Sequence, residues 1–179
     1  MIEAGSRGFV WEYRMNLIDV MRRTGGLSAL TDRVDLPPAQ VSEAATTLLP
    51  FVLAGLRRVY EEYGPENAVM RLESLGGEEL ASNVLMPGEI VPSVGEVLLD
   101  FLFGSRDASL KVQDAACSAT DLELPQCRQV LCLLAMLVGG YLVSRASQDS
   151  AQLAKDIDAA WMTHAGSDPL GAILRSHEN

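Results

Sequence analysis

LSALTDRVDLPPAQVSEAATTLLPFVLAGL, residues 27–56, aligns with QDAACSATDLELPQCRQVLCLLAMLVGGYL, residues 113–142, when the chain is shifted on itself by 86 positions. Seven of the thirty aligned positions are identical, where a chance alignment of this composition gives about two or three. The sequence therefore predicts two degenerate copies of one structural unit. The identical pairs are Ala29/Ala115, Asp35/Asp121, Leu36/Leu122, Gln40/Gln126, Leu48/Leu134, Val52/Val138 and Leu56/Leu142.

Each copy carries an Asp–Leu pair at the same place, Asp35-Leu36 in the first and Asp121-Leu122 in the second. The residues before the pair suit a short helix, and the apolar residues after it recur at spacings of three and four, which is typical of a long helix. Aspartate is one of the few residues other than glycine that tolerates the left-handed conformation after a helix. We therefore expect each unit to be a helix, a tight turn and a long helix.

The two units, at about 27–63 and 108–144, are expected to share one core, because each long helix is too apolar to stand alone. Convincing period-two alternation occurs nowhere, so the predicted fold class is all-α and multihelical. We expect residues 1–14 to be an N-terminal extension, 15–146 the helical repeat domain and 147–179 a C-terminal helical tail.

The spacing of Ser93 and Glu96 predicts a capping box, in which the two side chains close the start of a helix that runs through the apolar residues up to Phe103. Gly104 then ends that helix.

Gly139-Gly140 and the aligned Ala54-Gly55 are small enough to let helix backbones approach closely.

The composition is that of a globular protein with an aliphatic core, since 48% of the 179 residues are hydrophobic and only 6% are aromatic. A formal net charge of -10 disfavours generic nucleic-acid binding, because the negative field repels phosphates. The longest uncharged stretch, Gln129–Ser144, has 16 residues, fewer than the roughly 20 of a spanning helix. We expect it to be a buried core helix and the protein not to be transmembrane.

The three cysteines, Cys117, Cys127 and Cys132, are an odd number without CxxC spacing, and the chain opens without a signal-peptide pattern. These features favour a reducing cytoplasm and cysteines that serve only packing. The two histidines, His164 and His177, both lie in the tail, so a zinc or Cys–His site is not expected.

No catalytic residue, cofactor-binding residue or metal ligand is predicted. The sequence contains no GxSxG elbow, phosphate-binding glycine loop, HExxH or EF-hand pattern. Acidic pairs such as Glu61-Glu62 and Glu78-Glu79 are explained by solvated helix faces. A paired-carboxylate enzyme stays open in principle, since such residues need not be close in sequence.

The segment LTDRVDLPPAQVSEAA, residues 30–45, has the outline of a helix-turn-helix. A recognition helix should present basic or amide side chains, whereas the outward candidates here are Gln40, Ser42, Glu43 and Thr46. We therefore favour a structural helical hairpin, and keep a divergent DNA-binding domain as an alternative.

The strings MNLIDVM, LSALTDRVDLPPAQVSEAATTLLPFVLAGL and GEVLLDFLFGS, followed by the second helical copy, resemble bacterial family 937 of the domains of unknown function, a YidB-like group. The resemblance covers about Met15 to Ser144. It departs at the first turn, where the family favours Gly-Leu-Ser-Pro, and at Met136, where the family usually has a proline. The resemblance implies an α-helical repeat that begins near Met15, and it implies no activity.

The sequence thus predicts a non-catalytic protein–protein interaction or assembly module, which we expect to self-associate or to bind a protein partner. Trp161 and Met162, in the tail helix, are the candidate partner-binding residues, with docking on the protein's own core as the alternative. A second hypothesis is a hydrophobic-ligand carrier, in which the two apolar helices separate to enclose the ligand.

Overall fold

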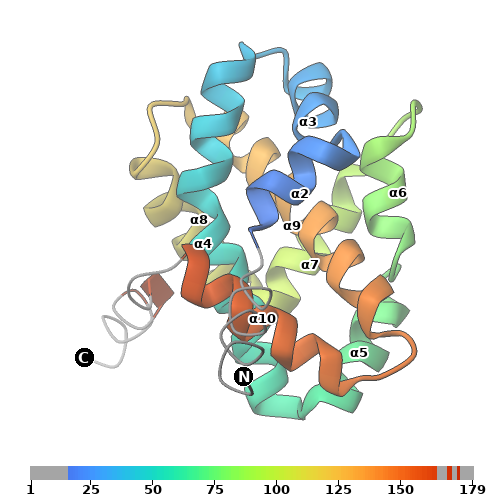
Figure 1. Ribbon diagram of the computed structural model, residues 1–179. Helices are drawn as coiled ribbons and strands as arrows, with labels where there is room; N and C mark the ends of the chain where they lie inside the picture. Colours follow the sequence, from blue (N-terminus) through green and yellow to red (C-terminus); the bar gives the residue numbers. More distant parts are fainter. Residues whose placement is uncertain (1–15, 165–168, 171–172, 174–179) are drawn as a thin grey trace, which may run out of the picture.

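The computed structural model describes residues 16–164, 169–170 and 173, and in this part of the chain it contains nine helices and no strand (Figure 1). The all-α, multihelical fold predicted from the sequence is confirmed. The helices are α2 (Leu17–Thr24), α3 (Gly26–Val34), α4 (Pro38–Tyr63), α5 (Pro65–Ser74), α6 (Glu79–Leu85), α7 (Pro92–Phe103), α8 (Arg106–Ser118), α9 (Leu124–Ala146) and α10 (Ala151–His164).

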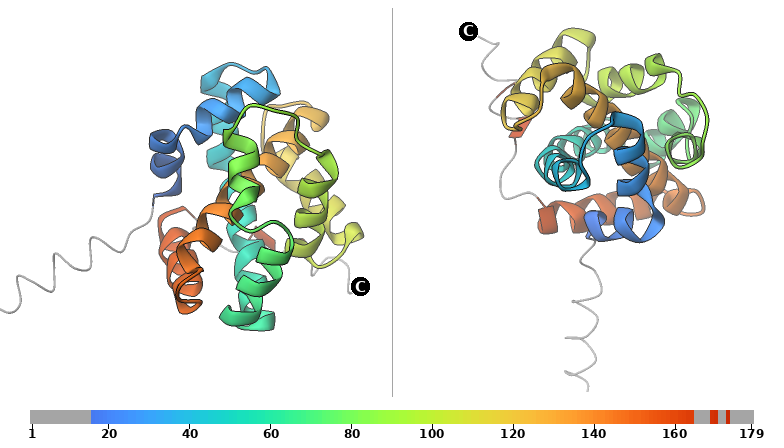
Figure 2. Two further views of the ribbon diagram at one scale, coloured as in Figure 1. Left: turned by 90° about the vertical axis from the view of Figure 1, so that its right-hand side faces the viewer. Right: turned by 90° about the horizontal axis from the view of Figure 1, so that it is seen from above.

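Helix α9 is the centre of the fold. It has 23 residues, and buried side chains occur on all of its faces from Cys127 to Ala146. The helix packs against α3, α4, α5, α6, α7, α8 and α10, which surround it in the views of Figures 1 and 2. The sequence reason is that no charged residue occurs between Arg128 and Arg145, so α9 has no polar face to turn toward water.

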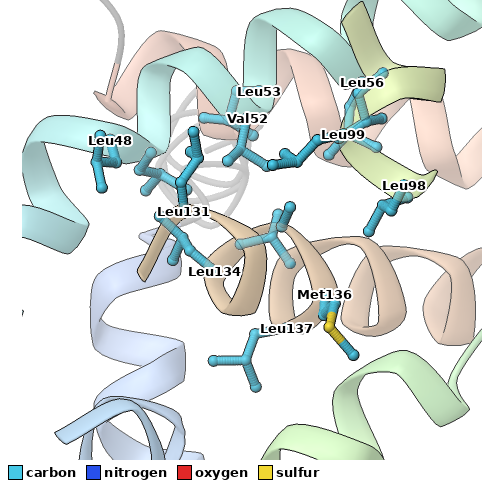
Figure 3. Close-up of a cluster of buried hydrophobic side chains, with 14 of the residues drawn as sticks. Leu48, Val52, Leu53, Leu56, Leu98, Leu99, Leu131, Leu134, Met136 and Leu137 are labelled. Carbon is cyan, nitrogen blue, oxygen red and sulfur yellow. The ribbon is translucent and has the colours of Figure 1, made fainter. Parts of the chain in front are cut away.

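The two long helices pack directly against each other. From α4, Leu48, Val52 and Leu53 are fully buried. Figure 3 shows this stripe facing Leu131 and Leu134 of α9, with side chains of α7 at one end of the cluster. The facing side chains of α4 and α9 therefore belong to one buried core.

Gly140 and Gly55 each allow a close helix crossing, but not the crossing of the two long helices. A Cβ atom on Gly140 of α9 would lie 2.5 Å from the backbone nitrogen of Ala81 in α6, and one on Gly55 of α4 would lie 2.9 Å from Cβ of Leu102 in α7. A Cβ atom on Gly139 would meet only Cδ2 of Leu98, at 3.9 Å. The close helix crossings therefore fix α6 on α9 and α7 on α4.

The two aligned segments each hold a short helix before a long one, α3 before α4 and α8 before α9, but their turns differ. Asp35 ends α3 in the left-handed conformation, with φ of 53°, as predicted. Asp121 does not, because α8 ends at Ala119 in a right-handed conformation and a longer connection leads to α9. The prediction of equivalent aspartate caps is wrong for the second copy.

The start of α7 also differs from the prediction. The helix begins at Pro92 after Val91, and no side-chain cap is formed, so the capping box of Ser93 and Glu96 is wrong. Proline suits the first helical position because its fixed φ matches the helix and its missing N–H is not needed there. Gly104 ends α7 in a left-handed conformation, as expected.

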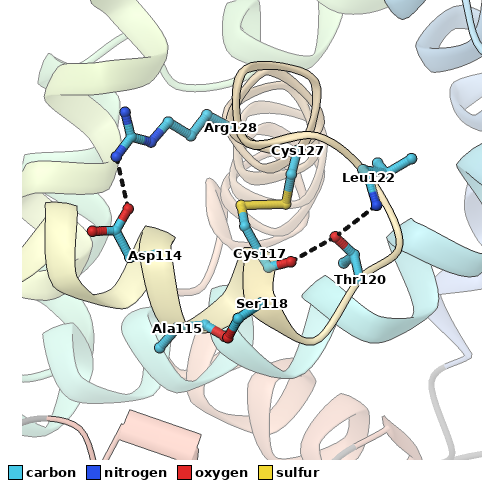
Figure 4. The surroundings of a disulfide bond; sticks show 8 residues. All are labelled: Asp114, Ala115, Cys117, Ser118, Thr120, Leu122, Cys127 and Arg128. Carbon is cyan, nitrogen blue, oxygen red and sulfur yellow. Dashed lines mark hydrogen bonds and ion pairs between the residues drawn. A yellow bond between two sulfur atoms is a disulfide. The ribbon is translucent and has the colours of Figure 1, made fainter.

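A disulfide joins Cys117 near the end of α8 to Cys127 in the first turns of α9 (Figure 4). This corrects the expectation that all the cysteines serve only packing. The short connection between the helices brings the two Cα atoms to 5.6 Å, within the range for a disulfide. Cys132 is a free thiol.

The tail docks on the core as far as it is described. Helix α10 packs on α4 and α9, with Leu153 and Ile157 buried, and Leu170 beyond it is also buried. Polar contacts also hold α10 to the two long helices. The Tyr60 hydroxyl of α4 donates a hydrogen bond to Asp158 at 2.7 Å, and Arg145 of α9 forms an ion pair with the buried carboxylate of Asp156 at 2.7 Å. The predicted extension, residues 1–14, lies outside the described residues.

By length and composition alone, α4 and α9 are each apolar enough to cross a membrane. In the structure, 72% of the most apolar α9 window and 56% of the α4 window are buried inside the protein. The core helix of a globular protein passes the same test, and α9 is largely buried, as the sequence predicted for residues 129–144.

The α6–α9 crossing generates a paired prediction. Gly140→Ala should lower the free energy of unfolding by about 1–3 kcal/mol, because the new methyl group meets the backbone of α6. Gly139→Ala, the matched control, should leave it unchanged or raise it by up to about 1 kcal/mol through higher helix propensity. Urea unfolding of both variants measures the difference, and equal stability of the two would contradict the packing described.

The disulfide generates a second prediction. Denatured protein that has never met a reductant should contain one titratable thiol, that of Cys132, and three after reduction. The Cys117→Ser variant should unfold with about 2–3 kcal/mol less free energy, since the bond closes a loop with a sequence separation of 10. Three thiols before reduction would show that the bond is absent and would fit the reducing cytoplasm expected from the sequence.

Candidate functional site

A groove of about 850 Å³ lies between α3, α7, α8 and α9, beside the N-terminal half of α9. Its floor is apolar, with Leu133 and Met136 buried at the base. Leu110 of α8 and Leu124 of α9 stand on its walls and are exposed by 37% and 43%. The other lining residues are Asp32, Arg33, Ile90, Pro92, Gly95, Glu96, Asp100, Arg106, Gln113, Pro125, Arg128, Gln129 and Cys132.

One wall of the groove is held by a single arginine. Arg33 of α3 donates to four carbonyl oxygens at and after the end of α6, those of Asn83, Val84, Met86 and Gly88, at 2.6–3.0 Å. These contacts satisfy carbonyls that a helix end leaves without partners. They fix the loop that carries Ile90 and Pro92 to the groove.

The floor is shaped by the close approach of α7 to α9. Gly95 lies over Cys132, and a Cβ atom on Gly95 would be 2.9 Å from Cβ of Cys132. Burial raises the pKa of the Cys132 thiol to about 11, and the carboxylates of Glu96 and Asp100 add to the rise. The thiol is therefore kept protonated at neutral pH, the opposite of an activated nucleophile.

Helix α8 contributes a buried polar pair to the groove. Ser109 is fully buried and Gln113 is 7% exposed, and the Gln113 side-chain amide donates to the Ser109 hydroxyl at 3.0 Å. This hydrogen bond gives the two buried polar side chains a partner in each other.

The arginine at the inner end of the groove is already paired. Nη2 of Arg128 lies 2.7 Å from Oδ1 of Asp114, which Figure 4 shows beside the disulfide. Its Nε atom is buried without a hydrogen-bond partner in the described part of the chain. Since Asp114 neutralises Arg128 and carbonyl oxygens occupy Arg33, neither guanidinium is free to receive an anion.

The predicted partner-binding residues lie elsewhere, on α10. Trp161 is half-buried against the core, with the guanidinium of Arg57 5.0 Å from its ring centre. Met162 is 79% exposed. The structure thus separates the two: Trp161 packs on the protein itself, and Met162 points to solvent. Neither lines the groove.

The outward side chains at the start of α4 include Gln40, Glu43 and Thr46, as the sequence indicated, and no arginine or lysine stands among them. Among the described residues, no three histidine, cysteine, aspartate or glutamate side chains come close enough together to hold a metal ion. His164, at the end of α10, accepts a hydrogen bond from the backbone N–H of Leu17 at 2.9 Å and so fixes the start of α2.

No protein-family model, no curated protein and no solved structure matches this chain. The resemblance to family 937 therefore stays a prediction that rests on the quoted sequence strings.

Proposed function

We propose that this protein is a non-catalytic binding module and that the groove between α3, α7, α8 and α9 receives part of a protein partner. The observation that carries the proposal is an apolar groove in which two leucines, Leu110 and Leu124, are exposed on the walls above a buried base. Apolar clefts rimmed by polar residues are typical of interaction sites.

The chemistry of the groove supports binding rather than catalysis. Its one thiol, Cys132, has a raised pKa, and two of its three arginines are occupied by groups of the protein itself. A thiol that acts as a nucleophile or general base would instead need a pKa shifted toward neutral pH. The proposal therefore assigns no catalytic residue and no cofactor.

Self-association was expected from the sequence because two strongly apolar helices needed cover. In the structure α4 and α9 cover each other within one chain. That pairing leaves neither helix in need of a second copy. We therefore retain the hypothesis that a different protein binds in the groove.

A second candidate is a carrier of a small apolar ligand, and the size of the groove favours it. Small-molecule sites have volumes of about 300–1,000 Å³, a range that includes this one. The ligand would lie on the α7–α8 side of α9, and not between the two long helices as the sequence-based hypothesis had it, because the facing side chains of α4 and α9 are buried against each other.

The proposal is tested by a photo-crosslinking amino acid placed at Leu124 on the groove wall, with the same amino acid at Met70 as control. Met70 is 59% exposed on α5, and it does not line the groove. We expect irradiation in cells to give a protein adduct at position 124 and none at 70, and the same protein to bind in purified form. Equal adducts at both positions would contradict the proposal, and so would a small molecule that co-purifies in native mass spectrometry.

A further inference from the structure

We propose that the groove is built for a cationic amphipathic helix of a partner protein, whose apolar side chains enter the floor while its lysines or arginines face the carboxylates on the rim. This inference rests on the proposed function above, since it names the class of partner for the same groove. The inference follows from which charged side chains of the groove have a partner within the protein and which have none.

Most of the arginine side chains that line the groove already contact other groups of the protein. Arg33 is held by four carbonyl oxygens and Arg128 by Asp114, so Arg106 is the lining arginine without a partner in the described part of the chain. An anionic ligand would have to compete with these internal contacts for the guanidinium N–H groups.

The carboxylates that line the groove are not paired in this way. Asp32 on α3 and Glu96 and Asp100 on α7 line it, and none of the three forms an ion pair within the described residues. Their field reaches the floor, where Glu96 and Asp100 help to hold Cys132 in its protonated form. Arg33 keeps its positive charge although carbonyl oxygens occupy its donors, so three carboxylates stand against the charges of Arg33 and Arg106. The excess of negative charge favours a cationic partner.

The arrangement of apolar and charged groups suits a helix. A helix bound in a groove inserts side chains spaced at i, i+3, i+4 and i+7 and turns its polar face outward. Here Leu133 and Met136 form the base, Leu110 and Leu124 the walls, and the carboxylates the rim.

The charge of the whole chain acts in the same direction. A net charge of -10 attracts a basic segment before contact and repels an acidic one. Association of this kind weakens as salt rises, because the attraction is screened over a Debye length of about 10 Å at 0.1 M. Salt dependence is therefore a signature that separates this recognition from purely apolar binding.

The experiment uses the full chain and two blocked, fluorescein-labelled 14-residue peptides, one of leucine and lysine at helical spacing and one with glutamate in place of each lysine. Fluorescence anisotropy measures the binding of each at 50 and 300 mM salt. We expect the lysine peptide to bind at least about tenfold more tightly than the glutamate peptide at low salt, and the difference to shrink at high salt.

The binding site is located by charge-matched variants. Glu96→Gln with Asp100→Asn should weaken lysine-peptide binding about five- to tenfold, because two rim charges are lost. Glu43→Gln with Glu73→Gln removes the same charge from exposed positions that do not line the groove, and should change binding less than about twofold. Circular dichroism confirms that both double variants remain folded.

Each outcome bears on the proposal. Equal binding of the two peptides, equal effects of the two double variants, or a preference for the glutamate peptide would overturn it. If neither peptide binds while the crosslink at position 124 still captures a protein, the cationic-helix inference fails and the proposed function stands. If that crosslink also fails, the proposed function fails with it.

Discussion

The enclosure of α9 is the constraint on which the rest of the structure depends. A helix of 23 residues without a charged side chain through its middle cannot leave a face in water, so it needs neighbours on every side. Seven helices supply them. The crossing at Gly140 sets how closely α6 can approach, and Gly55 does the same for α7 on α4. The short connecting turns follow from the need to bring these helices back to one centre.

Enclosing one helix with separate neighbours leaves a gap where two of them diverge. Helices α7 and α8 pack on each other and on α9, and the groove opens between them and α3. The gap is stabilised by groups on its margins: Arg33 holds the loop before α7, and the disulfide together with the Arg128–Asp114 pair holds α8 to α9. A groove with fixed walls and an apolar floor is suited to binding, because little order is lost when a partner arrives.

The sequence predicted the helices well because their periodicity, prolines and glycines are local signals. The apolar stripes of α4 and α9 and the stop at Gly104 could be read directly. The unequal turns at Asp35 and Asp121 could not, because the length of each connection depends on where the next helix must pack. The groove was missed for the same reason: Asp32, Glu96, Leu110 and Arg128 come from four helices, and no spacing in the chain links them. The single clue was Arg128, a charge at the start of the longest uncharged stretch of the chain.

The enclosure of α9 by seven other helices is tested most directly by native-state hydrogen exchange in detergent-free buffer. Amides of α9 between residues 130 and 143 should exchange only through global unfolding, with the same free energy that urea denaturation gives, while amides of the peripheral α10 exchange through smaller openings. Exchange of α9 amides through a smaller opening than α10, or a chain that needs detergent to stay in solution, would contradict it.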